Sequence, residues 1–411
     1  MVNIYNQLKK SIRTTCQPLH RRFSLKQMGA FNLGEGRPNR IGRALVSYVS
    51  DYVRHVTQRA GQDVWDRQDV DEVLDQLYVG SFLGHENHRT SADLVRVLIE
   101  RGFIVDCIYD RAGYLIEDAS RYDCILDEWD NLPRWASTNP KARKCFYGTG
   151  CHWISWNQAD LQRVAWLFQR KGVALAPPFQ LPPLLGLADA KLATYYGNDA
   201  ALQQFGVFQP KMRKLWVCPS VASVAWKTKK WDAARRSFLY FGSSAWLHRG
   251  LDLVIEAFLK LDFDLYICGS DRGFLEVYGA ELKQAPNIHY EGFVTPGSDK
   301  FKELTDKTVA VVYPSAAEGC STSVLQCMRF GLIPLVTEAT GLSIHNKWPP
   351  LKGSTDLELI EDLRRRCVEL SDKSSTQLDE LSRCMWDYAS NNHSRPAFRT
   401  SLDGMLDELL A

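Results

Sequence analysis

Short apolar runs alternate with helical periodicities through the first half of the chain. Helices are predicted over residues 90–101 and 157–170, and in the first of them Leu94, Val95, Leu98 and Ile99 share one face. Strands are predicted over residues 77–83, 103–109, 122–126, 144–147 and 191–196. Strands that alternate with helices indicate a parallel sheet covered on both faces.

A second series with the same alternation follows a polar, lysine-rich connection at residues 222–236. Strands are predicted over residues 238–242, 263–268, 287–290, 309–313 and 332–336, and a helix over residues 250–259. The expected fold class is therefore α/β, with two Rossmann-like, doubly wound domains joined near residue 225. Such sheets bind ligands beyond the carboxyl ends of their strands, so we expect the site in the cleft between the domains.

The N-terminus has a different composition. Residues 1–34 contain no Asp or Glu but carry Lys9, Lys10, Arg13, Arg21, Arg22 and Lys26. Three interpretations stay open: a solvated extension, a transit peptide, or a basic amphipathic helix that gives residues 1–26 a peripheral contact with an anionic membrane. Of the next two apolar runs, we take residues 77–83 as the strand that feeds the first helix, and residues 44–49 as an added edge strand.

These patterns predict four parts of the chain. Residues 1–76 form a basic N-terminal extension and connector, residues 77–225 a first Rossmann-like domain, residues 226–395 a second Rossmann-like domain, and residues 396–411 a C-terminal helix that could cross back to the first domain.

Composition removes several classes of function. The chain has 411 residues with 50 Lys+Arg against 48 Asp+Glu, so its charge gives no reason to expect nucleic-acid binding. Its longest apolar runs have the length of strands, so no transmembrane helix is predicted. Eleven cysteines without a Cys-x-x-Cys pair fit a reducing cytosol, and we expect a cytoplasmic protein.

The strongest motif lies at residues 313–340, where a buried strand ends in a loop that carries Glu318 and Gly319. The residues that open the next helix are Cys320, Ser321, Thr322 and Ser323. Unpaired N–H groups at a helix start suit a phosphate, and a carboxylate there can accept hydrogen bonds from sugar hydroxyls. Thr322 and Gln326 share a face toward the same cleft. The plainer interpretation is that the serines only cap the helix and that Glu318 is a surface charge.

A second motif lies at residues 241–258. Ser243 and Ser244 follow a strand, and Arg249 and Gly250 stand at the start of the next helix. Arg249 could neutralise a diphosphate, which the backbone at Gly250 could approach closely. The alternative is a solvated arginine beside a helix-start glycine.

Together these two motifs resemble the nucleotide-binding half of GT-B glycosyltransferases, specifically the large retaining family 4. The resemblance rests on LDLVIEAF at residues 251–258 and on Pro314-Ser315, Glu318-Gly319, Cys327-Met328, Gly331 and Pro334 in order. It covers roughly residues 235–345. The segment NIHYEGFV at residues 287–294 resembles the family's nucleobase-lining segment, which implies a donor contact at Phe293.

The resemblance implies a role for each matching residue. Glu318 contacts the donor sugar, and Arg249, which stands in place of the family's Lys, assists departure of the diphosphate. Ser243 stands where the family has Arg. Gln326 replaces a second Glu that holds the ribose hydroxyls, so its hydrogen bonds lack charge assistance. The resemblance also implies retention of anomeric configuration, with the leaving phosphate deprotonating the acceptor.

Candidate acceptor-side residues lie in the first half. His152 follows a predicted strand and is our candidate for the family's cleft histidine, with a structural histidine as the alternative. His85 and Asn87 lie in a loop that could meet the acceptor, although a polar loop is the plainer interpretation.

The expected function is transfer of a sugar from a nucleotide-sugar donor to a glycan or lipid-linked saccharide, in cell-surface polysaccharide or glycoconjugate synthesis. The alternative is a non-catalytic sugar-nucleotide-binding or partner subunit. No cofactor and no metal are expected. The two Asp-x-Asp triplets, Asp69–Asp71 and Asp262–Asp264, do not follow a suitable strand, and no His/Cys cluster suggests zinc.

Overall fold

The computed structural model describes residues 25–79, 84–221, 224–242, 244–269, 271–344 and 346–411. The predicted contact of residues 1–26 with a membrane falls almost entirely outside this part of the chain. Within it, no helix combines the length and apolar character needed to cross a bilayer.

The first domain is built on a seven-stranded sheet of order β1-β3-β2-β4-β5-β6-β7. Its strands are β1 (Gly29–Leu33), β2 (Gly42–Tyr48), β3 (Phe103–Tyr109), β4 (Cys124–Asp127), β5 (Arg143–Phe146), β6 (Leu192–Tyr195) and β7 (Met212–Lys214). All neighbours are parallel except β1, which runs antiparallel to β3. Helices of this domain are α2 (Leu25–Met28), α3 (Asp51–Ala60), α4 (Val70–Tyr78), α5 (Glu86–Glu100), α6 (Leu132–Thr138), α7 (Trp153–Lys171) and α8 (Asp199–Gln203).

The second domain has a five-stranded parallel sheet of order β10-β9-β8-β11-β12. Its strands are β8 (Ser237–Phe241), β9 (Asp264–Cys268), β10 (Ile288–Gly292), β11 (Ala310–Tyr313) and β12 (Ile333–Val336). Its helices are α9 (Trp231–Ala234), α10 (Leu251–Phe258), α11 (Phe274–Leu282), α12 (Asp299–Lys307), α13 (Thr322–Met328), α14 (Asp356–Asp372) and α15 (Ser375–Asn391), and α16 (Arg395–Leu410) ends the chain.

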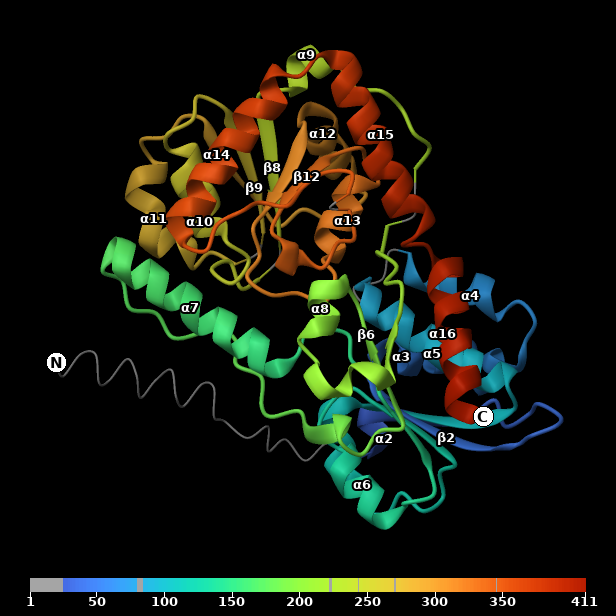
Figure 1. Ribbon diagram of the computed structural model, residues 1–411. Coiled ribbons are helices and arrows are strands. Elements are labelled where there is room, and N and C mark those ends of the chain that lie inside the picture. Colours follow the sequence, from blue (N-terminus) through green and yellow to red (C-terminus); the bar gives the residue numbers. More distant parts are fainter. Residues whose placement is uncertain (1–24, 80–83, 222–223, 243, 270, 345) are drawn as a thin grey trace.

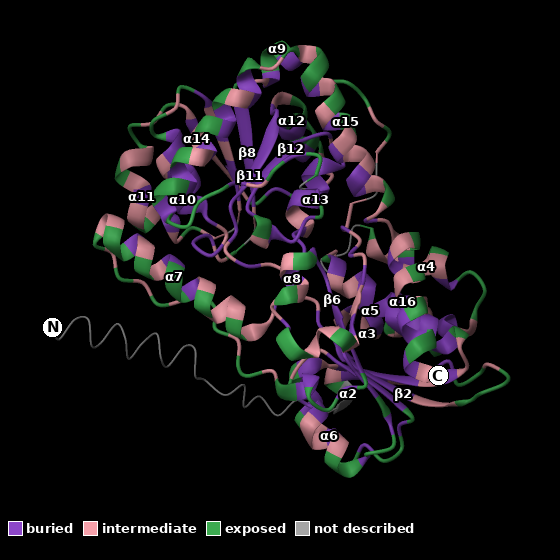
Figure 2. Ribbon diagram, in the orientation of Figure 1, coloured by how far each residue is buried: buried purple, intermediate pink, exposed green. Residues whose placement is uncertain are grey.

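Both sheets are buried between layers of helices (Figure 2). Every residue of the inner strands β8 and β11 and of the edge strand β12 of the second sheet is buried. Strands buried on both sides read as continuous apolar runs rather than alternating ones, which is why the sequence predicts them well. The predicted fold class, two Rossmann-like domains, is confirmed.

The start of the first domain needs correction. Where the structure describes it, the strand predicted over residues 77–83 is wrong, because Leu77 and Tyr78 form the end of helix α4. The strand that feeds the first sheet is β2, which lies between β3 and β4 rather than at an edge. Residues 29–76 therefore contribute two strands and two helices to the first domain and are not only an extension and connector. The outer antiparallel strand β1 was not predicted.

Two helices cross from one domain to the other. Helix α7 follows β5 of the first sheet yet extends along the second domain, below α10 and α11 in Figure 1. There Arg170 forms ion pairs with Asp252, Glu256 and Asp356. In the opposite direction α16 packs on the first domain, where Arg395 pairs with Asp71, Asp75 and Asp93. The two domains are thus linked by helices as well as by the chain connection.

Candidate active site

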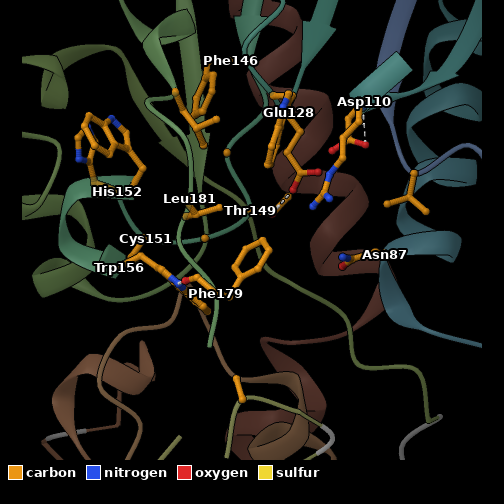
Figure 3. Close-up of a pocket in the computed structure, with 18 of the residues that line it drawn as sticks. Asn87, Asp110, Glu128, Phe146, Thr149, Cys151, His152, Trp156, Phe179 and Leu181 are labelled. Atoms are coloured by element: carbon orange, nitrogen blue, oxygen red, sulfur yellow. Dashed lines mark hydrogen bonds between the residues drawn. The ribbon is translucent and has the colours of Figure 1, made fainter. Parts of the chain in front are cut away.

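Among the cavities near the strand ends, one with a volume of about 710 Å³, called the larger cavity, lies between the domains (Figure 3). The first domain lines it with Tyr109, the last residue of β3, and with residues that follow β2, β3, β4 and β5: Val49, Asp110, Arg111, Glu128, Trp129, Gly148, Thr149, Gly150, Cys151 and His152. The second domain contributes Ser244, Ala245, Arg249 and Asp271, which follow β8 and β9. The cavity therefore lies beyond the carboxyl ends of both sheets, where doubly wound folds bind ligands.

Arg249 lines this cavity and forms an ion pair with Glu318, which is not itself among the lining residues. The Nε atom of Arg249 lies 3.6 Å from Oε1 of Glu318, and the two side chains are 19 % and 14 % exposed. Burial by itself lowers the pKa of Arg249, but the oxygens of Tyr313, Glu318 and Tyr240 outweigh burial, so its pKa rises and the guanidinium stays charged. The pair thus offers a fixed positive charge beside a carboxylate.

Gly250 fixes the backbone next to Arg249. Its φ is +75°, and a Cβ at this position would lie 2.5 Å from the carbonyl oxygen of Pro314. Only glycine fits both conditions. The turn therefore starts helix α10 close against the end of β11, which brings Arg249 to the loop that carries Glu318.

Glu318 also organises its own loop. Its Oε1 accepts hydrogen bonds from the hydroxyls of Ser315 at 3.1 Å and Tyr313 at 3.4 Å. The next residue, Gly319, abuts the first domain, since a Cβ there would lie 2.4 Å from the carbonyl oxygen of Thr149. Glu318 therefore lies where the loops after β11 and β5 meet.

A smaller cavity of about 360 Å³ lies at the start of α13. Gln326 lines it and is only 4 % exposed, yet its Oε1 has no hydrogen-bond partner among the described residues. Gly242, Gly269, Phe293 and Thr322 lie around the same space. Buried hydrogen-bond acceptors usually have a partner, and a hydroxyl group of a bound ligand could donate a hydrogen bond to this oxygen.

The first domain reaches into this smaller cavity. The hydroxyl of Thr322 donates to Oε1 of Glu86 at 2.6 Å, which links the start of α13 to the start of α5. The N–H of Ser321, predicted to be unpaired, instead donates to the carbonyl of Thr340 at 3.1 Å. That part of the predicted anion site is wrong, because a neighbouring turn supplies the acceptor.

His152 has a structural contact and also lines the larger cavity. Its Nδ1 accepts the backbone N–H of Ile154 at 3.3 Å, so the side chain caps helix α7. Burial lowers its pKa, which keeps the ring neutral at pH 7. With Nδ1 accepting, the proton of the neutral ring is on Nε2, so His152 presents one N–H donor.

The structure brings most of the predicted residues to the two cavities. Asn87, His152, Ser244 and Arg249 line the larger one, and His85, Phe293, Thr322 and Gln326 line the smaller one. Gly319, Cys320 and Ser321 are buried in the loop behind them. Ser243 lies outside the described residues.

Two carboxyl groups of the larger cavity were not predicted. Asp110 and Glu128 come directly after β3 and β4, and the position of acidic residues after predicted strands was the signal that could have found them. Burial, and the negative charge of Asp110, raise the pKa of Glu128 to about 8, and its side chain accepts a hydrogen bond from Thr149. Burial raises the pKa of Asp110 to about 6.

A buried His–Asp pair at the same cleft also went unpredicted. Nδ1 of His248 lies 2.6 Å from Oδ1 of Asp160, and its Nε2 lies 2.6 Å from the carbonyl oxygen of Ala317. Both side chains are fully buried, and the ring of Trp156 stacks on His248 with centroids 4.0 Å apart. Since Asp160 belongs to α7, this pair fastens α7 to the second domain.

In the described part of the chain, no group of three or more His, Cys, Asp or Glu side chains is placed to hold a metal ion.

Comparison with known proteins agrees with this architecture. Residues 235–347 match the family model of glycosyl transferases group 1. A search of curated proteins gives no match.

Solved structures share the fold at low sequence identity. HepE (Alr3699) of Anabaena, solved in complex with UDP, is 14 % identical over 90 % of this chain and 100 % of its own, with a TM-score of 0.51. TarM is 12 % identical over 77 % of this chain and 60 % of its own, with a TM-score of 0.51. WaaG, a glycosyltransferase involved in lipopolysaccharide biosynthesis, is 16 % identical over 52 % of this chain with a TM-score of 0.39. The chain spans only 61 % of the WaaG chain.

The matched segment contains β8 to β12 together with Arg249, Glu318 and Gln326. Residues 235–347 thus resemble a glycosyl transferases group 1 domain, and the chain has the two-domain GT-B fold that it shares with the HepE and TarM structures.

Proposed function

We propose that this enzyme moves a sugar from a nucleoside diphosphate sugar to a glycan or lipid-linked saccharide, with retention of anomeric configuration. The observation that carries the proposal is the Arg249–Glu318 pair at the carboxyl ends of the second domain's strands. A guanidinium and a carboxylate 3.6 Å apart match the two needs of the donor: a cation for the diphosphate and an acceptor for sugar hydroxyls.

In this proposal the donor lies across both cavities. Gln326 and Phe293 take the nucleoside in the smaller cavity, with the unpartnered Oε1 of Gln326 accepting from a ribose hydroxyl. Arg249 faces the diphosphate and stabilises the charge that develops as it leaves. Glu318 holds the transferred sugar, and the acceptor enters the larger cavity from the side of the first domain.

Retention follows in this proposal from the leaving phosphate acting as the base for the acceptor hydroxyl. His152 is then a donor to the acceptor or the transferred sugar rather than a base, because its Nδ1 already accepts a hydrogen bond within α7.

The proposed function is tested by thermal shift with a panel of nucleotide sugars and free nucleoside diphosphates. UDP leads the panel because the HepE structure holds it. A ligand at 100 times its Kd stabilises the folded state by about 2.7 kcal/mol, so the matching donor should raise the Tm by several degrees.

Arg249→Ala is the diagnostic variant. The loss of a charge-assisted contact should weaken nucleoside diphosphate binding by roughly 10- to 150-fold, an effect of about 1.5–3 kcal/mol, and should weaken nucleoside binding far less. An equal loss of affinity for both ligands in calorimetry would show that Arg249 does not contact the diphosphate.

If the unmodified protein bound the donor but did not turn it over, a non-catalytic subunit would be favoured.

A further inference from the structure

The larger cavity has two ends of different chemistry. Figure 3 shows Asn87, Asp110 and Glu128 on one side, and Phe146 and Leu181 toward the other. The apolar end is lined by Phe146, Leu181, Leu184, Leu187 and Phe205, and His152, whose ring centroid lies 5.7 Å from that of Phe205, is a polar side chain beside them. A ligand that fills the cavity therefore meets carboxyl and amide groups at one end and mainly hydrocarbon at the other.

The apolar end is built in advance of any ligand. Phe146, Leu187 and Phe205 are buried at 3–4 % exposure in the core beneath it. The wall at Leu181 is held by two hydrogen bonds of 2.8 Å between its backbone N–H and C=O and the side-chain amide of Asn157. The wall therefore does not depend on the ligand for its position.

The apolar surface continues to the mouth of the cavity. Phe179 is 41 % exposed there, which is high for a phenylalanine, and its ring meets Trp156 edge-on with centroids 6.3 Å apart. The indole N–H of Trp156 donates to the carbonyl of Phe179 at 2.8 Å, so the rim segment is fixed to helix α7. Phe179 and Trp156 thus add a fixed, partly exposed apolar surface to the lining of the cavity.

The polar end, where Arg111 lines the cavity beside Asp110 and Glu128, suits hydroxyl groups, which can both donate and accept hydrogen bonds. Glu128 accepts from Thr149, and Asp110 accepts from the backbone N–H of Arg111 at 2.9 Å, so each carboxyl is held in place with capacity left for a ligand. The raised pKa of Glu128, about 8, keeps its carboxyl protonated at neutral pH, where it can donate to a ligand oxygen.

We propose that this cavity binds an acceptor in which an apolar group adjoins the hydroxyl-bearing sugar, such as an aryl or alkyl glycoside, with the sugar at Asp110 and Glu128 and the apolar group between Leu181 and Phe205. A free oligosaccharide would leave hydroxyls against this hydrocarbon wall without partners, which is unfavourable. That this ligand is the acceptor rests on the proposed function, to which the inference adds the chemical class of the acceptor.

Tryptophan fluorescence tests the binding directly and needs no donor, because Trp129, Trp153 and Trp156 line the cavity. Pairs of glycosides that differ only in the aglycone, methyl against octyl or 4-nitrophenyl, are titrated for a set of common hexoses. The aryl or alkyl member of the matching pair should bind at least tenfold more tightly than the methyl member.

Variants separate this site from general hydrophobic adsorption. Leu181→Ala and Leu184→Ala should each reduce the ratio of affinities, aryl or alkyl glycoside over methyl glycoside, at least threefold. Leu181→Met, which keeps the apolar volume, should preserve this ratio. The matched control is Leu185→Ala: this neighbour of Leu184 is 56 % exposed and is not among the cavity-lining residues. The ratio of glycoside affinities in Leu185→Ala should equal that of the unmodified protein.

Equal binding of methyl and aryl or alkyl glycosides, or a preference that is the same in all four variants, would overturn the inference. Failure of the proposed function would look different: no nucleotide sugar would be bound or hydrolysed, while the glycoside titrations could still give the predicted preference.

Discussion

Glu318 has more structural partners than its loop position suggests. It pairs with Arg249 and accepts from the buried hydroxyls of Tyr313 and Ser315, so removal of its carboxyl would leave these groups without that acceptor. Glu318→Ala would therefore combine a loss of stability with any loss of chemistry. An isosteric change separates the two.

We predict that Glu318→Gln retains the fold but lowers kcat/KM for transfer at least 100-fold, about 2.7 kcal/mol at the transition state. The amide oxygen can still accept from Ser315 and Tyr313, but the negative charge beside Arg249 and the donor sugar is gone. Circular dichroism and the Tm serve as controls for folding. Normal turnover in this variant would exclude Glu318 from the donor site.

The carboxyl group of Glu128 makes the stability of the protein depend on pH. Its folded-state pKa of about 8 is above its ordinary value of 4.5, so it destabilises the fold increasingly as pH rises from about 4.5 through 8. Glu128→Gln removes this effect. The variant should be more stable than the unmodified protein at pH 8, by at least about 1 kcal/mol, the equivalent of one pKa unit being about 1.36 kcal/mol.

Thermal unfolding of both proteins between pH 5 and pH 9 measures that difference. The gap in Tm should widen with rising pH. A gap that stays constant across this range would show that Glu128 titrates normally.

Helix α7 is the element that couples site and scaffold. It contributes Trp153 and Trp156 to the larger cavity, and its far end is fixed to the second domain by Arg170. Arg170 is 8 % exposed and faces three carboxylates, of which that of Asp252 is fully buried. Removal of the guanidinium would leave the buried carboxylate of Asp252 without its ion-pair partner.

We predict that Arg170→Leu destabilises the protein by about 3–5 kcal/mol, the usual cost of breaking a buried ion pair from one side. Addition of Asp252→Asn should recover part of the loss, because the stranded charge is then absent. Arg236→Ala is the matched control, since its pair with Asp262 is largely exposed and should contribute less than about 1 kcal/mol. A urea midpoint for Arg170→Leu equal to that of Arg236→Ala would contradict the account.

Apolar periodicity predicted the inner strands of both sheets, which are largely buried on both faces, but missed the edge strands β1 and β7 of the first sheet, which are only partly buried. β3, Phe103–Tyr109, lies where it was expected. The error at residues 77–83 arose because an apolar run of seven residues is compatible with a strand or with the end of an amphipathic helix, and α4 proved to be the latter at Leu77 and Tyr78. No local sequence pattern indicates that β2 lies inside the sheet, because the order of strands depends on contacts between segments that are distant in sequence.

At the scale of the molecule, the domains are linked in both directions, by α7 and by α16. Arg395 and Arg399 of α16 reach Asp71, Asp75, Asp93 and Glu100 of the first domain. One of the Asp-x-Asp triplets thus has a structural role, because Asp71 holds the C-terminal helix.

The residues of the candidate site were predictable where they lie within one of the two short motifs of the second domain. Arg249, Glu318 and Gln326 lie close in sequence to the strand ends that place them. Asp110, Glu128 and the His248–Asp160 pair come from distant segments that only the packing of the two sheets and α7 brings to one cleft. The pairing of Ser321 with Thr340 was hidden for the same reason.

The most direct test of the central claim is proton NMR of the anomeric signals while the purified enzyme consumes a nucleotide sugar, with the donor identified by thermal shift. The donor signal should decay, and the first sugar signal to appear, on acceptor or on water, should have the donor's own anomeric configuration. Arg249→Ala should abolish the reaction. A folded enzyme that consumes none of the nucleotide sugars it binds would contradict the claim of sugar transfer, and a first product of opposite configuration would contradict retention.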